Sequence, residues 1–318
     1  MTLTDAPTML ALHQTTLGGP DVLRLTELPR PEPGLGEILV AVHAAGLNPT
    51  DVKHRATSIF LPPPPLTLGW DVSGTVAGTG PGVTLFQPGD EVFGMLPYPY
   101  GAGSHAEYVT GPTRAFVPKP GGIDHVQAAA LPLAALTAWQ ALVETAKLEK
   151  GQRVLIHAAA GGVGHLAVQI AKERGAHVTG TASAPKHAFL RELGADACID
   201  HRSEDFTKTG ERYDVVLDAL GGKNATRSVG VLRPGGVLVS LVPGAEDTQA
   251  AAEKAQVRAV TLIVEHDQAG MRAIADLVDR GRLRAHISAT FPLAEGARAH
   301  ALGETGRTTG KLVITVSS

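Results

Sequence analysis

Short apolar runs alternate with polar and glycine-rich breaks along the chain, and their period changes near residue 131. Before this point apolar positions recur at every second residue, as in 37–43 and 71–77, which is the period of a half-buried strand. Turn signals separate these runs at short intervals, among them Gln-Pro-Gly-Asp at 87–90. Short strands interrupted this often predict a compact β-rich barrel or sandwich over the first 130 residues.

Beyond residue 131 the pattern becomes an alternation of strands and helices. We expect a helix over 128–144, and later helices over 185–193 and 268–280. Alternation of this kind predicts right-handed βαβ units and a doubly wound parallel sheet, so the fold class is α/β. The strands are expected at 153–156, 176–181, 197–200, 213–218, 236–242 and 259–264.

The last stretch, residues 285–318, predicts a strand, a helix over 293–302 and a closing strand over 311–316. It is too short to form a domain of its own, so we expect it to complete the first domain. The predicted organisation is a β-rich domain of residues 1–130 plus 283–318, into which a nucleotide-binding domain of residues 131–282 is inserted. A ligand cleft is expected between the two.

A glycine-rich turn follows the expected strand at 153–156 and leads into an amphipathic helix that Gly175 ends. Strand, glycine turn and helix in this order are the context that a dinucleotide fingerprint requires. Glycines let the backbone approach a pyrophosphate, and the helix N-terminus offers N–H groups and a positive dipole. Ala159 replaces the first glycine of the fingerprint. The residues expected to contact the cofactor here are Ala160, Gly161, Gly162, Val163 and Gly164.

Charge and cysteine content exclude several classes of protein. Lys and Arg number 28 and Asp and Glu 31, and no basic stripe appears, which argues against a nucleic-acid partner. The single cysteine, Cys198, excludes an internal disulfide and a four-cysteine zinc lobe. No apolar run reaches the length of a membrane span, and we expect a soluble, cytoplasmic protein without a membrane partner.

Five motifs, taken in order, resemble the zinc-free branch of the medium-chain dehydrogenase/reductases, which includes NADPH:quinone oxidoreductases and enone reductases. The resemblance covers essentially the whole chain. It implies a GroES-like catalytic domain and a Rossmann domain. The motifs are AAGLNPTD at 44–51, LGWDVSG at 68–74, QPGDEV at 87–92, AAGGVG at 159–164 and GKLV at 310–313.

The same resemblance predicts that no metal is bound. Asn48 stands where zinc-dependent relatives carry a cysteine, and Gly69-Trp70-Asp71 stands where they carry Gly-His-Glu. His43, His54 and His105 match no ligand spacing. Without a Lewis acid, alcohol oxidation loses its usual means of stabilising an alkoxide. The expected reaction is hydride transfer to a quinone or to an alkene conjugated to a carbonyl.

Asn48 is the candidate for a polar contact to the developing oxyanion, or for holding the nicotinamide ribose; the alternative is an Asn-Pro turn residue. Thr137 matches a family position beside the nicotinamide, although it could equally serve packing. No proton donor is assigned, although a tyrosine near the loop 101–105 is expected to line the pocket. The resemblance further implies cofactor contacts from Leu220, Leu241 and Lys311. The tyrosines in question are Tyr98, Tyr100 and Tyr108.

The sequence favours NADPH over NADH. No acidic residue occurs between Glu173 and Glu192, where an NAD-specific enzyme places the carboxylate that binds the ribose. Ser183 and Lys186 can instead bind a 2′-phosphate, with His201 in the place where relatives often carry a tyrosine. The alternative is that Lys186 and the next residue simply begin a solvated helix.

Two other functions stay open: a zinc-free alcohol or aldehyde reductase, and a non-enzymatic NADPH-binding protein. The apolar strand at 259–264, at the end of the Rossmann sheet, predicts a homodimer because exposed strand edges tend to find partners. The physiological substrate depends on loops whose shape cannot be read from sequence.

Overall fold

A computed structural model describes residues 7–316. Contacts divide the chain into unit 1, made of Met1–Leu136 and Glu265–Ser318, and unit 2, made of Thr137–Val264. The unit 1 strands are β1 (Thr8–Gln14), β2 (Arg24–Pro29), β3 (Glu37–Leu47), β4 (Leu66–Thr67), β5 (Asp71–Thr79), β6 (Glu91–Met95), β7 (Tyr108–Pro112), β8 (Phe116–Pro118), β15 (Ile287–Pro292) and β16 (Lys311–Thr315). Its helices are α1 (Pro49–Ala56), α2 (His125–Ala129), α8 (Gln268–Asp279) and α9 (Gly296–Glu304), with short 3₁₀ turns η1 (Pro20–Val22), η2 (Thr113–Ala115) and η6 (Leu293–Glu295).

Unit 2 is built around one parallel sheet. Its strands are β9 (Arg153–Ile156), β10 (His177–Ala182), β11 (Ala197–Asp200), β12 (Tyr213–Asp218), β13 (Leu232–Ser240) and β14 (Arg258–Thr261). Its helices are α4 (Gly164–Glu173), α5 (His187–Glu192), α6 (Lys223–Val229) and α7 (Thr248–Ala255), with the π-helical segment η3 (Gln140–Thr145) and the turns η4 (Ala184–Lys186) and η5 (Phe206–Lys208). Helix α3 (Pro132–Trp139) carries the chain from unit 1 into unit 2.

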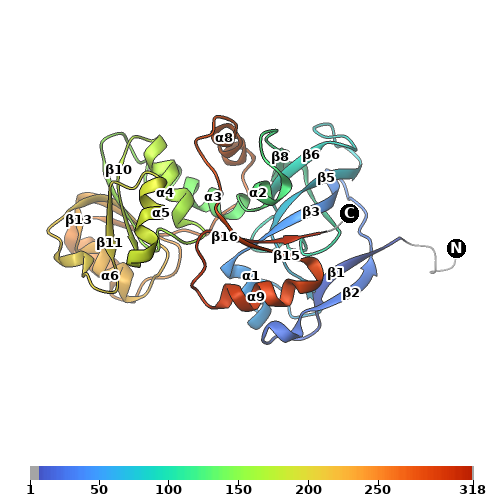
Figure 1. Ribbon diagram of the computed structural model, residues 1–318, viewed down its shortest axis with the longest axis horizontal. Helices are drawn as coiled ribbons and strands as arrows, with labels where there is room; N and C mark the ends of the chain where they lie inside the picture. The colour runs from blue at the N-terminus through green and yellow to red at the C-terminus, as the bar shows by residue number, and fades with distance from the viewer. Residues whose placement is uncertain (1–6, 317–318) are drawn as a thin grey trace. The chain divides into compact units, whose positions relative to one another are not determined.

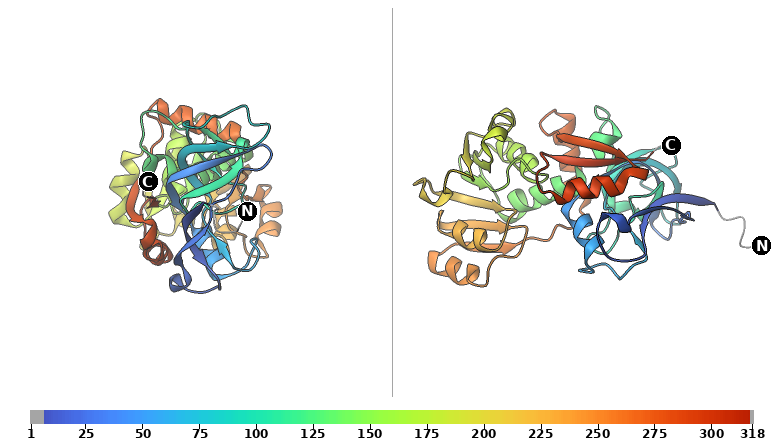
Figure 2. Two further views of the ribbon diagram at one scale, coloured as in Figure 1. Left: turned by 90° about the vertical axis from the view of Figure 1, so that its right-hand side faces the viewer. Right: turned by 60° about the horizontal axis from the view of Figure 1, so that its bottom comes forward.

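Two sheets make up unit 1. Seven strands form the larger sheet, in the order β15-β16-β3-β5-β6-β8 with β7 paired to β3, and β2-β1-β4 form the smaller one. Strand β16 pairs antiparallel with β3, so the C-terminal segment completes a sheet begun near the N-terminus. Figure 2 shows α9 (red) beside the N-terminal blue segments, where it packs on η1.

Strand β3 extends four residues beyond the predicted end at residue 43. Alternation is lost there because Ala44, Ala45, Gly46 and Leu47 are all buried. A Cβ at Gly46 would lie 2.4 Å from the carbonyl oxygen of Ala129 and 2.5 Å from Oδ2 of Asp71. Gly46 therefore lets the Asp71 carboxylate approach the β3 backbone, which matters for the site described below.

The single helix predicted over 128–144 is wrong. The chain forms α2, breaks at Ala130 and Leu131, resumes as α3 at Pro132 and continues as the π-helical η3. Proline fixes φ and has no N–H to donate, so it begins a helix more readily than it continues one. Helix α8 lies in unit 1, where the Gln268 side chain donates to the carbonyl oxygen of Phe116 (3.0 Å).

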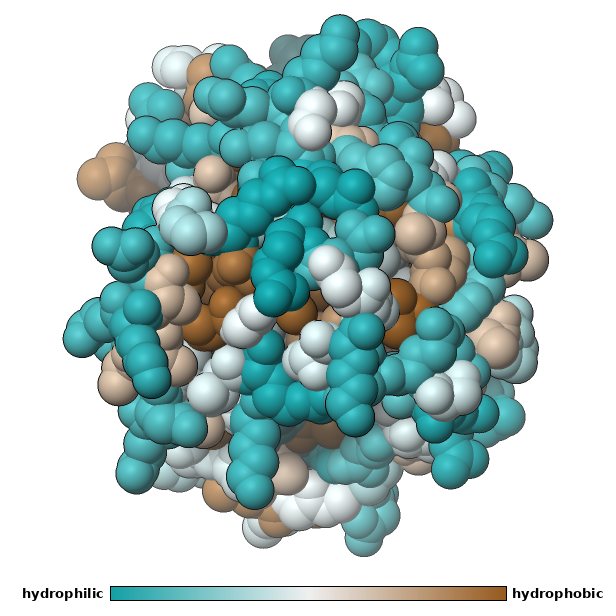
Figure 3. All heavy atoms as spheres, turned by 90° about the vertical axis from the view of Figure 1, so that its left-hand side faces the viewer, coloured by the Kyte–Doolittle hydropathy of each residue, from teal (hydrophilic) through white to brown (hydrophobic). Residues whose placement is uncertain are grey.

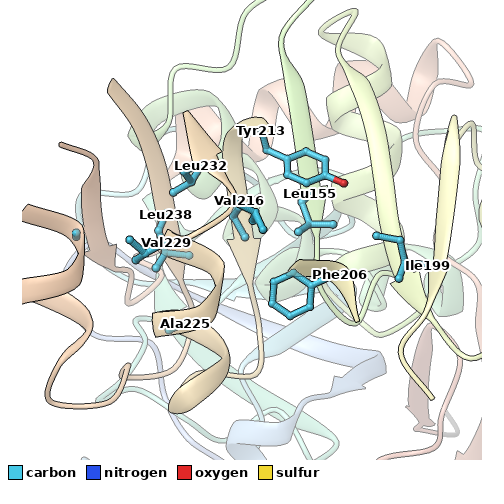
Figure 4. Packing of buried hydrophobic residues seen from close by; sticks show 11 residues of the cluster. Leu155, Ile199, Phe206, Tyr213, Val216, Ala225, Val229, Leu232 and Leu238 are labelled. Atoms are coloured by element: carbon cyan, nitrogen blue, oxygen red, sulfur yellow. The ribbon is translucent and has the colours of Figure 1, made fainter. Parts of the chain in front are cut away.

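The sheet of unit 2 has the order β11-β10-β9-β12-β13-β14, and its pairs are parallel. Figure 1 shows helices beside this sheet, and Figure 4 shows part of its core, with Leu155, Val216 and Leu238 of three neighbouring strands packed with Phe206 and Val229. The face in Figure 3 is mainly hydrophilic, with apolar side chains in hollows near its middle. The structure confirms the α/β class, with a GroES-like β-rich part and a Rossmann-like parallel sheet.

Candidate functional site

The glycine turn lies between β9 and α4, as the sequence predicts. Gly161 donates its N–H to the carbonyl oxygen of Ala158 (2.9 Å), which closes the turn. Within residues 7–316 the N–H groups of Ala160, Gly162 and Val163 have no hydrogen-bond acceptor. Backbone N–H groups at the start of a helix are the donors that a pyrophosphate needs. The turn therefore fits a dinucleotide phosphate.

Close packing explains both the glycine at position 164 of this turn and the departure of the turn from the fingerprint. A Cβ at Gly164 would lie 2.4 Å from the carbonyl oxygen of Ala158, so only glycine fits there. Ala159 takes the place of the first glycine, and a Cβ at Gly180 of β10 would lie 2.8 Å from the Ala159 methyl group. The methyl group of Ala159 is accommodated because the neighbouring strand carries a glycine opposite it.

Ser183 and Lys186 lie where β10 ends: Ser183 directly precedes the turn η4, and Lys186 is the last residue of that turn. Arg202 follows Asp200 by two residues, and Asp200 pairs with Ala182 at the end of β10. Burial and the charge of Arg202 both lower the pKa of Lys186. His201 is exposed beside Arg202. Asp200 adds a negative charge here, and its oxygens accept from the Arg202 N–H and from the Ser203 hydroxyl (both 3.1 Å). The chain thus brings two cations to the end of β10.

The loop after β12 contains the next expected contact. Asp218 is buried, and its carboxylate accepts the N–H groups of Leu220 (3.0 Å) and Gly221 (3.1 Å) and the side-chain amide of Asn224 (2.9 Å). The Leu220 side chain is 55% exposed. Leu241, after β13, donates its N–H to the carbonyl oxygen of Asp218 (2.8 Å). Leu220 and Leu241 therefore belong to one turn system organised by Asp218.

In unit 1, Asn48 and Lys311 are in direct contact. Asn48 caps the N-terminus of α1, with Pro49 as the first helical residue. Pairing of Leu47 with Leu312 brings Lys311 beside Asn48, and the Lys311 ammonium donates to Asn48 Oδ1 and to the carbonyl oxygen of Leu47 (3.0 Å). Asn48 and Lys311 are each 3% exposed.

Asp71 completes this cluster. Its Oδ2 accepts from Asn48 Nδ2 (2.9 Å) and from the Lys311 ammonium (3.3 Å), while its Oδ1 accepts the N–H of Leu133 (2.7 Å). The second hydrogen of Asn48 Nδ2 has the carbonyl oxygen of Gly46 at 3.5 Å as its nearest acceptor in the described chain, a weak contact. That hydrogen is the group Asn48 can offer to a ligand.

The cluster contains one buried carboxyl group, Asp71, and a second, Asp51, borders it. Burial raises the pKa of Asp71, and the nearby Lys311 ammonium opposes this rise. Burial also raises the pKa of Asp51 to about 7, against the hydrogen bond that its Oδ2 accepts from the Asn48 N–H (2.7 Å). Asp51 is therefore partly protonated at neutral pH, whereas Asp71 faces a fixed positive charge.

Of the three tyrosines, Tyr98 lies nearest this cluster. Its hydroxyl is 3.2 Å from Oγ1 of Thr50 on α1, and its ring packs edge-on against Trp70, with ring centroids 5.2 Å apart. Phe60 lies edge-on to Tyr98 at 6.4 Å. Tyr100 is exposed and Tyr108 lies under the Arg30 guanidinium, so these two are separate from the aromatic cluster of Trp70, Tyr98 and Phe60.

The three histidines have separate environments. His43 stacks on His125, His54 bonds within α1 and His105 packs edge-on against His300. Among residues 7–316 no group of three or more His, Cys, Asp or Glu side chains is arranged to hold a metal ion. None of the described helices combines the length and apolar character needed to cross a membrane.

Sequence reasoning missed two groups at these sites. Asp71 was noted only as part of the segment that stands in place of Gly-His-Glu, yet it bonds both Asn48 and Lys311. His157, directly before the glycine turn, was not singled out, yet its ring is buried and bonds two neighbouring elements. A buried charge next to a glycine-rich strand, and a histidine at the end of an apolar strand, are the signals that were available.

Thr137 is buried in α3, at the first position of unit 2. Its exposure is 6%. Its place in the helix is compatible with both readings of the sequence, cofactor contact and packing.

Comparison with known proteins places this arrangement in a family. Residues 34–121 match the family described as alcohol dehydrogenase GroES-like domain, and residues 193–314 match the one described as zinc-binding dehydrogenase. The mitochondrial NAD(P)H oxidoreductase RTN4IP1 of Mus musculus is 36% identical, over 88% of this chain and 82% of that protein. The chloroplastic NADPH-dependent alkenal/one oxidoreductase of Arabidopsis thaliana is 34% identical, over 96% and 79%.

A solved structure agrees over nearly the whole chain. The quinone oxidoreductase from Coxiella burnetii superposes with a TM-score of 0.92 at 39% identity, covering 98% of this chain and 100% of that one. Fold, sequence and the positions of the matched motifs therefore point the same way. The chain belongs to the medium-chain dehydrogenase/reductases, among the NAD(P)H-dependent quinone and alkenal oxidoreductases.

Proposed function

We propose that this protein is an NADPH-dependent reductase that transfers hydride, without a metal, to a quinone or to an alkene conjugated to a carbonyl. The observation that carries the proposal is the glycine turn, whose three N–H groups without acceptors fit a pyrophosphate. Ala160, Gly161, Gly162, Val163 and Gly164 would hold the phosphates. The reduced nicotinamide, when bound, supplies the hydride.

Charge at the end of β10 supports NADPH over NADH. Lys186 follows β10 and Arg202 follows the paired strand β11, with Ser183 directly before the turn that holds Lys186 and His201 next to Arg202 in the sequence. Two cations and a hydroxyl stabilise a 2′-phosphate, whereas Asp200 already has donors of its own. The relative from Arabidopsis thaliana is named as NADPH-dependent, which agrees with this choice.

Residues of unit 1 would orient the acceptor. Asn48 would donate the Nδ2 hydrogen that makes only a weak bond to the Gly46 carbonyl oxygen (3.5 Å), and Lys311 and Asp71 fix the amide so that this hydrogen keeps its direction. A fixed donor stabilises an oxygen that gains charge as hydride arrives. Tyr98 and Phe60 supply aromatic surface beside α1, suited to a flat conjugated acceptor, and the buried Trp70 packs edge-on against Tyr98. No proton donor is assigned, and water can protonate the product.

The donor set also favours a reaction without zinc. Asn48 takes the first of the expected ligand positions, and its side chain is engaged by Lys311 and Asp71. Trp70 takes the second, and an indole is not a zinc ligand. Elemental analysis of purified protein should find no stoichiometric zinc, and chelators should leave turnover unchanged. One zinc per chain whose removal abolishes activity would contradict this part of the proposal.

Turnover separates the proposal from its alternatives. NADPH oxidation should be followed with a quinone, an enone and an aldehyde offered separately. Consumption with the quinone or the enone supports the proposal. Consumption with the aldehyde alone would favour an alcohol or aldehyde reductase, and tight NADPH binding without turnover would favour a non-enzymatic NADPH-binding protein.

We also propose that two copies associate through β14. This strand is an edge of the unit 2 sheet, and Ile263 just beyond it is 52% exposed. The Leu262 N–H donates to the carbonyl oxygen of Ser240 (2.8 Å), so Leu262→Pro disturbs this edge. Light scattering at micromolar concentration should show a dimer that Leu262→Pro weakens. A monomeric wild type would contradict the proposal.

A further inference from the structure

The His157 ring links elements that the proposed cofactor site depends on. It is 2% exposed, at the end of β9 and directly before the glycine turn. Its Nδ1 lies 3.2 Å from Oγ1 of Thr181 on β10, and its Nε2 lies 3.0 Å from Oγ of Ser228 on α6. The ring also packs edge-on against Phe206, with centroids 4.6 Å apart.

Ser228, His157, Thr181 and Ala158 form a chain of hydrogen bonds, called here the His157 hydrogen-bond chain. The donor of each bond in it can be assigned in one way only. The Ser228 hydroxyl donates to the carbonyl oxygen of Asn224 (2.7 Å), and because it has a single hydrogen, it must accept from His157 Nε2. The proton of the neutral ring is therefore on Nε2, and the bare Nδ1 accepts from the Thr181 hydroxyl. Thr181 Oγ1 in turn accepts the N–H of Ala158 (3.2 Å).

The two ends of the His157 hydrogen-bond chain lie in the two loops of the candidate cofactor site. At one end it holds the N–H of Ala158, a non-glycine residue with φ of 50° and the acceptor that closes the glycine turn. At the other end is Asn224, whose side-chain amide donates to Asp218, the residue that organises the Leu220 loop. Both loops follow neighbouring strands, β9 and β12.

We propose that His157 is a positioning residue for the dinucleotide: its neutral ring, protonated at Nε2, fixes the first peptide of the glycine turn to α6. This role rests on the proposed function, since it needs a dinucleotide to position. His157 touches no cofactor atom and acts through Thr181 and Ala158. Because the pyrophosphate is common to both cofactors, loss of the His157 hydrogen-bond chain weakens the binding of NADPH and of NADH equally.

The charges around the ring agree with a neutral imidazole. Burial lowers the pKa of His157 to about 4; Asp218 from β12 opposes this shift and Arg227 from α6 adds to it. Arg227 is itself paired with Asp205, which precedes η5. At neutral pH the imidazole is therefore neutral and carries a single N–H, as the hydrogen-bond assignment requires.

The test uses the full-length protein and two variants that cut the same link. His157→Phe keeps the ring volume but removes both nitrogens, and Thr181→Val removes only the hydroxyl. Each should raise the dissociation constant for NADPH and for NADH by about tenfold, with little change in kcat. His157→Asn keeps an acceptor near the place of Nδ1, and Thr181→Ser keeps the hydroxyl, so both should recover most of the affinity.

A control separates positioning from simple loss of stability. Val216→Ala opens a small cavity in the same sheet core but removes none of the hydrogen bonds of the His157 hydrogen-bond chain. It should leave both dissociation constants unchanged. An independent readout is the ¹⁵N spectrum of labelled imidazole, in which the His157 signals should show a proton on Nε2 and a bare Nδ1. If His157→Phe does not fold, Thr181→Val and the spectrum still decide.

Three results would overturn the inference: unchanged affinity in Thr181→Val, an equal loss in Val216→Ala, or a proton on Nδ1. A wild type that binds neither dinucleotide would overturn the proposed function and the positioning role with it. A wild type that binds, with variants that bind as well, would overturn only the role of His157.

Discussion

The two units hold their candidate site residues by opposite means. In unit 1 a buried ion pair, Lys311 with Asp71, fixes the Asn48 amide. In unit 2 the residues that fix the glycine turn, His157 and Thr181, are neutral. The two cations expected at the cofactor, Lys186 and Arg202, instead lie where solvent reaches them.

The difference follows from what each site would receive. A dinucleotide brings its own phosphate charges, and a buried charge beneath the turn would act on them strongly through a medium of low dielectric constant. Neutral hydrogen bonds fix the turn without that interaction. A quinone or enone is uncharged, so in unit 1 a buried ion pair can orient an amide without attracting or repelling the ligand. Four substitutions test this contrast, from the largest expected effect to the smallest.

Lys311→Met should have the largest effect, because it leaves the buried Asp71 without its cation. Breaking a buried pair from one side costs about 3–5 kcal/mol. The protein has two tryptophans, Trp70 in unit 1 and Trp139 in unit 2. In a Trp139→Phe background, Trp70 fluorescence during urea unfolding should therefore report the loss in unit 1.

The double variant Asp71→Asn with Lys311→Met is the control, because it removes both charges. It should be more stable than Lys311→Met alone, since no buried charge is left unpaired. If Lys311→Met costs no more than about 1 kcal/mol, the pair behaves like an exposed salt bridge and the contrast between the units fails.

Asp51→Asn should change how the stability of unit 1 depends on pH. Burial raises the pKa of Asp51 to about 7, so between about pH 4 and pH 7 the folded chain keeps a proton that the unfolded chain has released. This carboxyl group therefore makes the free energy of unfolding fall as pH rises through that range, by at most about 4 kcal/mol. Asp51→Asn should remove the fall, measured by urea unfolding at several pH values.

His157 should act with the opposite sign in unit 2. Burial lowers the pKa of His157 to about 4. Its contribution to the free energy of unfolding is therefore complete above the ordinary histidine pKa and is lost as pH falls toward 4. His105 in unit 1 has the same sign as His157, because burial lowers its pKa to about 4 as well. The difference between variant and parent, rather than the whole pH profile, is thus the quantity to compare. An Asp51→Asn profile parallel to that of the parent would contradict the first assignment.

Local patterns predicted much of unit 2. The strands at 153–156, 197–200 and 213–218 have the predicted bounds, because buried parallel strands are apolar runs with turns at both ends. The glycine turn and the residues after β10 were likewise found from spacing along one βαβ unit. The helix over 128–144 was wrong because tertiary packing and Pro132 break it.

Contacts between distant residues could not be predicted in this way. Asp71 and Lys311 are 240 positions apart, and His157 and Ser228 are 71 apart. Their contacts depend on the pairing of β16 with β3 and on how α6 packs, which no local pattern encodes. The place of the backbone turn that we propose to bind the cofactor was therefore predictable, whereas the side chains that bond to it were not.

Lys186→Ala should weaken cofactor binding and leave the free energy of unfolding nearly unchanged. Removing one of two cations at a 2′-phosphate should raise the Michaelis constant for NADPH by about tenfold, or about 1.4 kcal/mol, and leave NADH kinetics nearly unchanged. Lys172→Ala is a matched control, since Lys172 lies in the same unit and pairs with Asp196 (2.8 Å). Equal losses with both cofactors would show that Lys186 does not read the 2′-phosphate.

Arg227→Met should have the smallest effect, although it makes the same kind of change as Lys311→Met. Arg227 pairs with Asp205 and lies over the Phe206 ring, 4.9 Å from its centroid, but its side chain is 49% exposed. Because solvent screens such contacts, Arg227→Met should lower the free energy of unfolding by about 1 kcal/mol or less. Urea unfolding with Trp139 as the reporter, in a Trp70→Phe background, measures this loss. Because the Arg227 charge helps to lower the pKa of His157, the variant should also raise that pKa, visible in the ¹⁵N titration of the ring. A cost above about 2 kcal/mol would mean that unit 2, like unit 1, depends on an ion pair, and that its neutral hydrogen-bond chain is not what holds the turn.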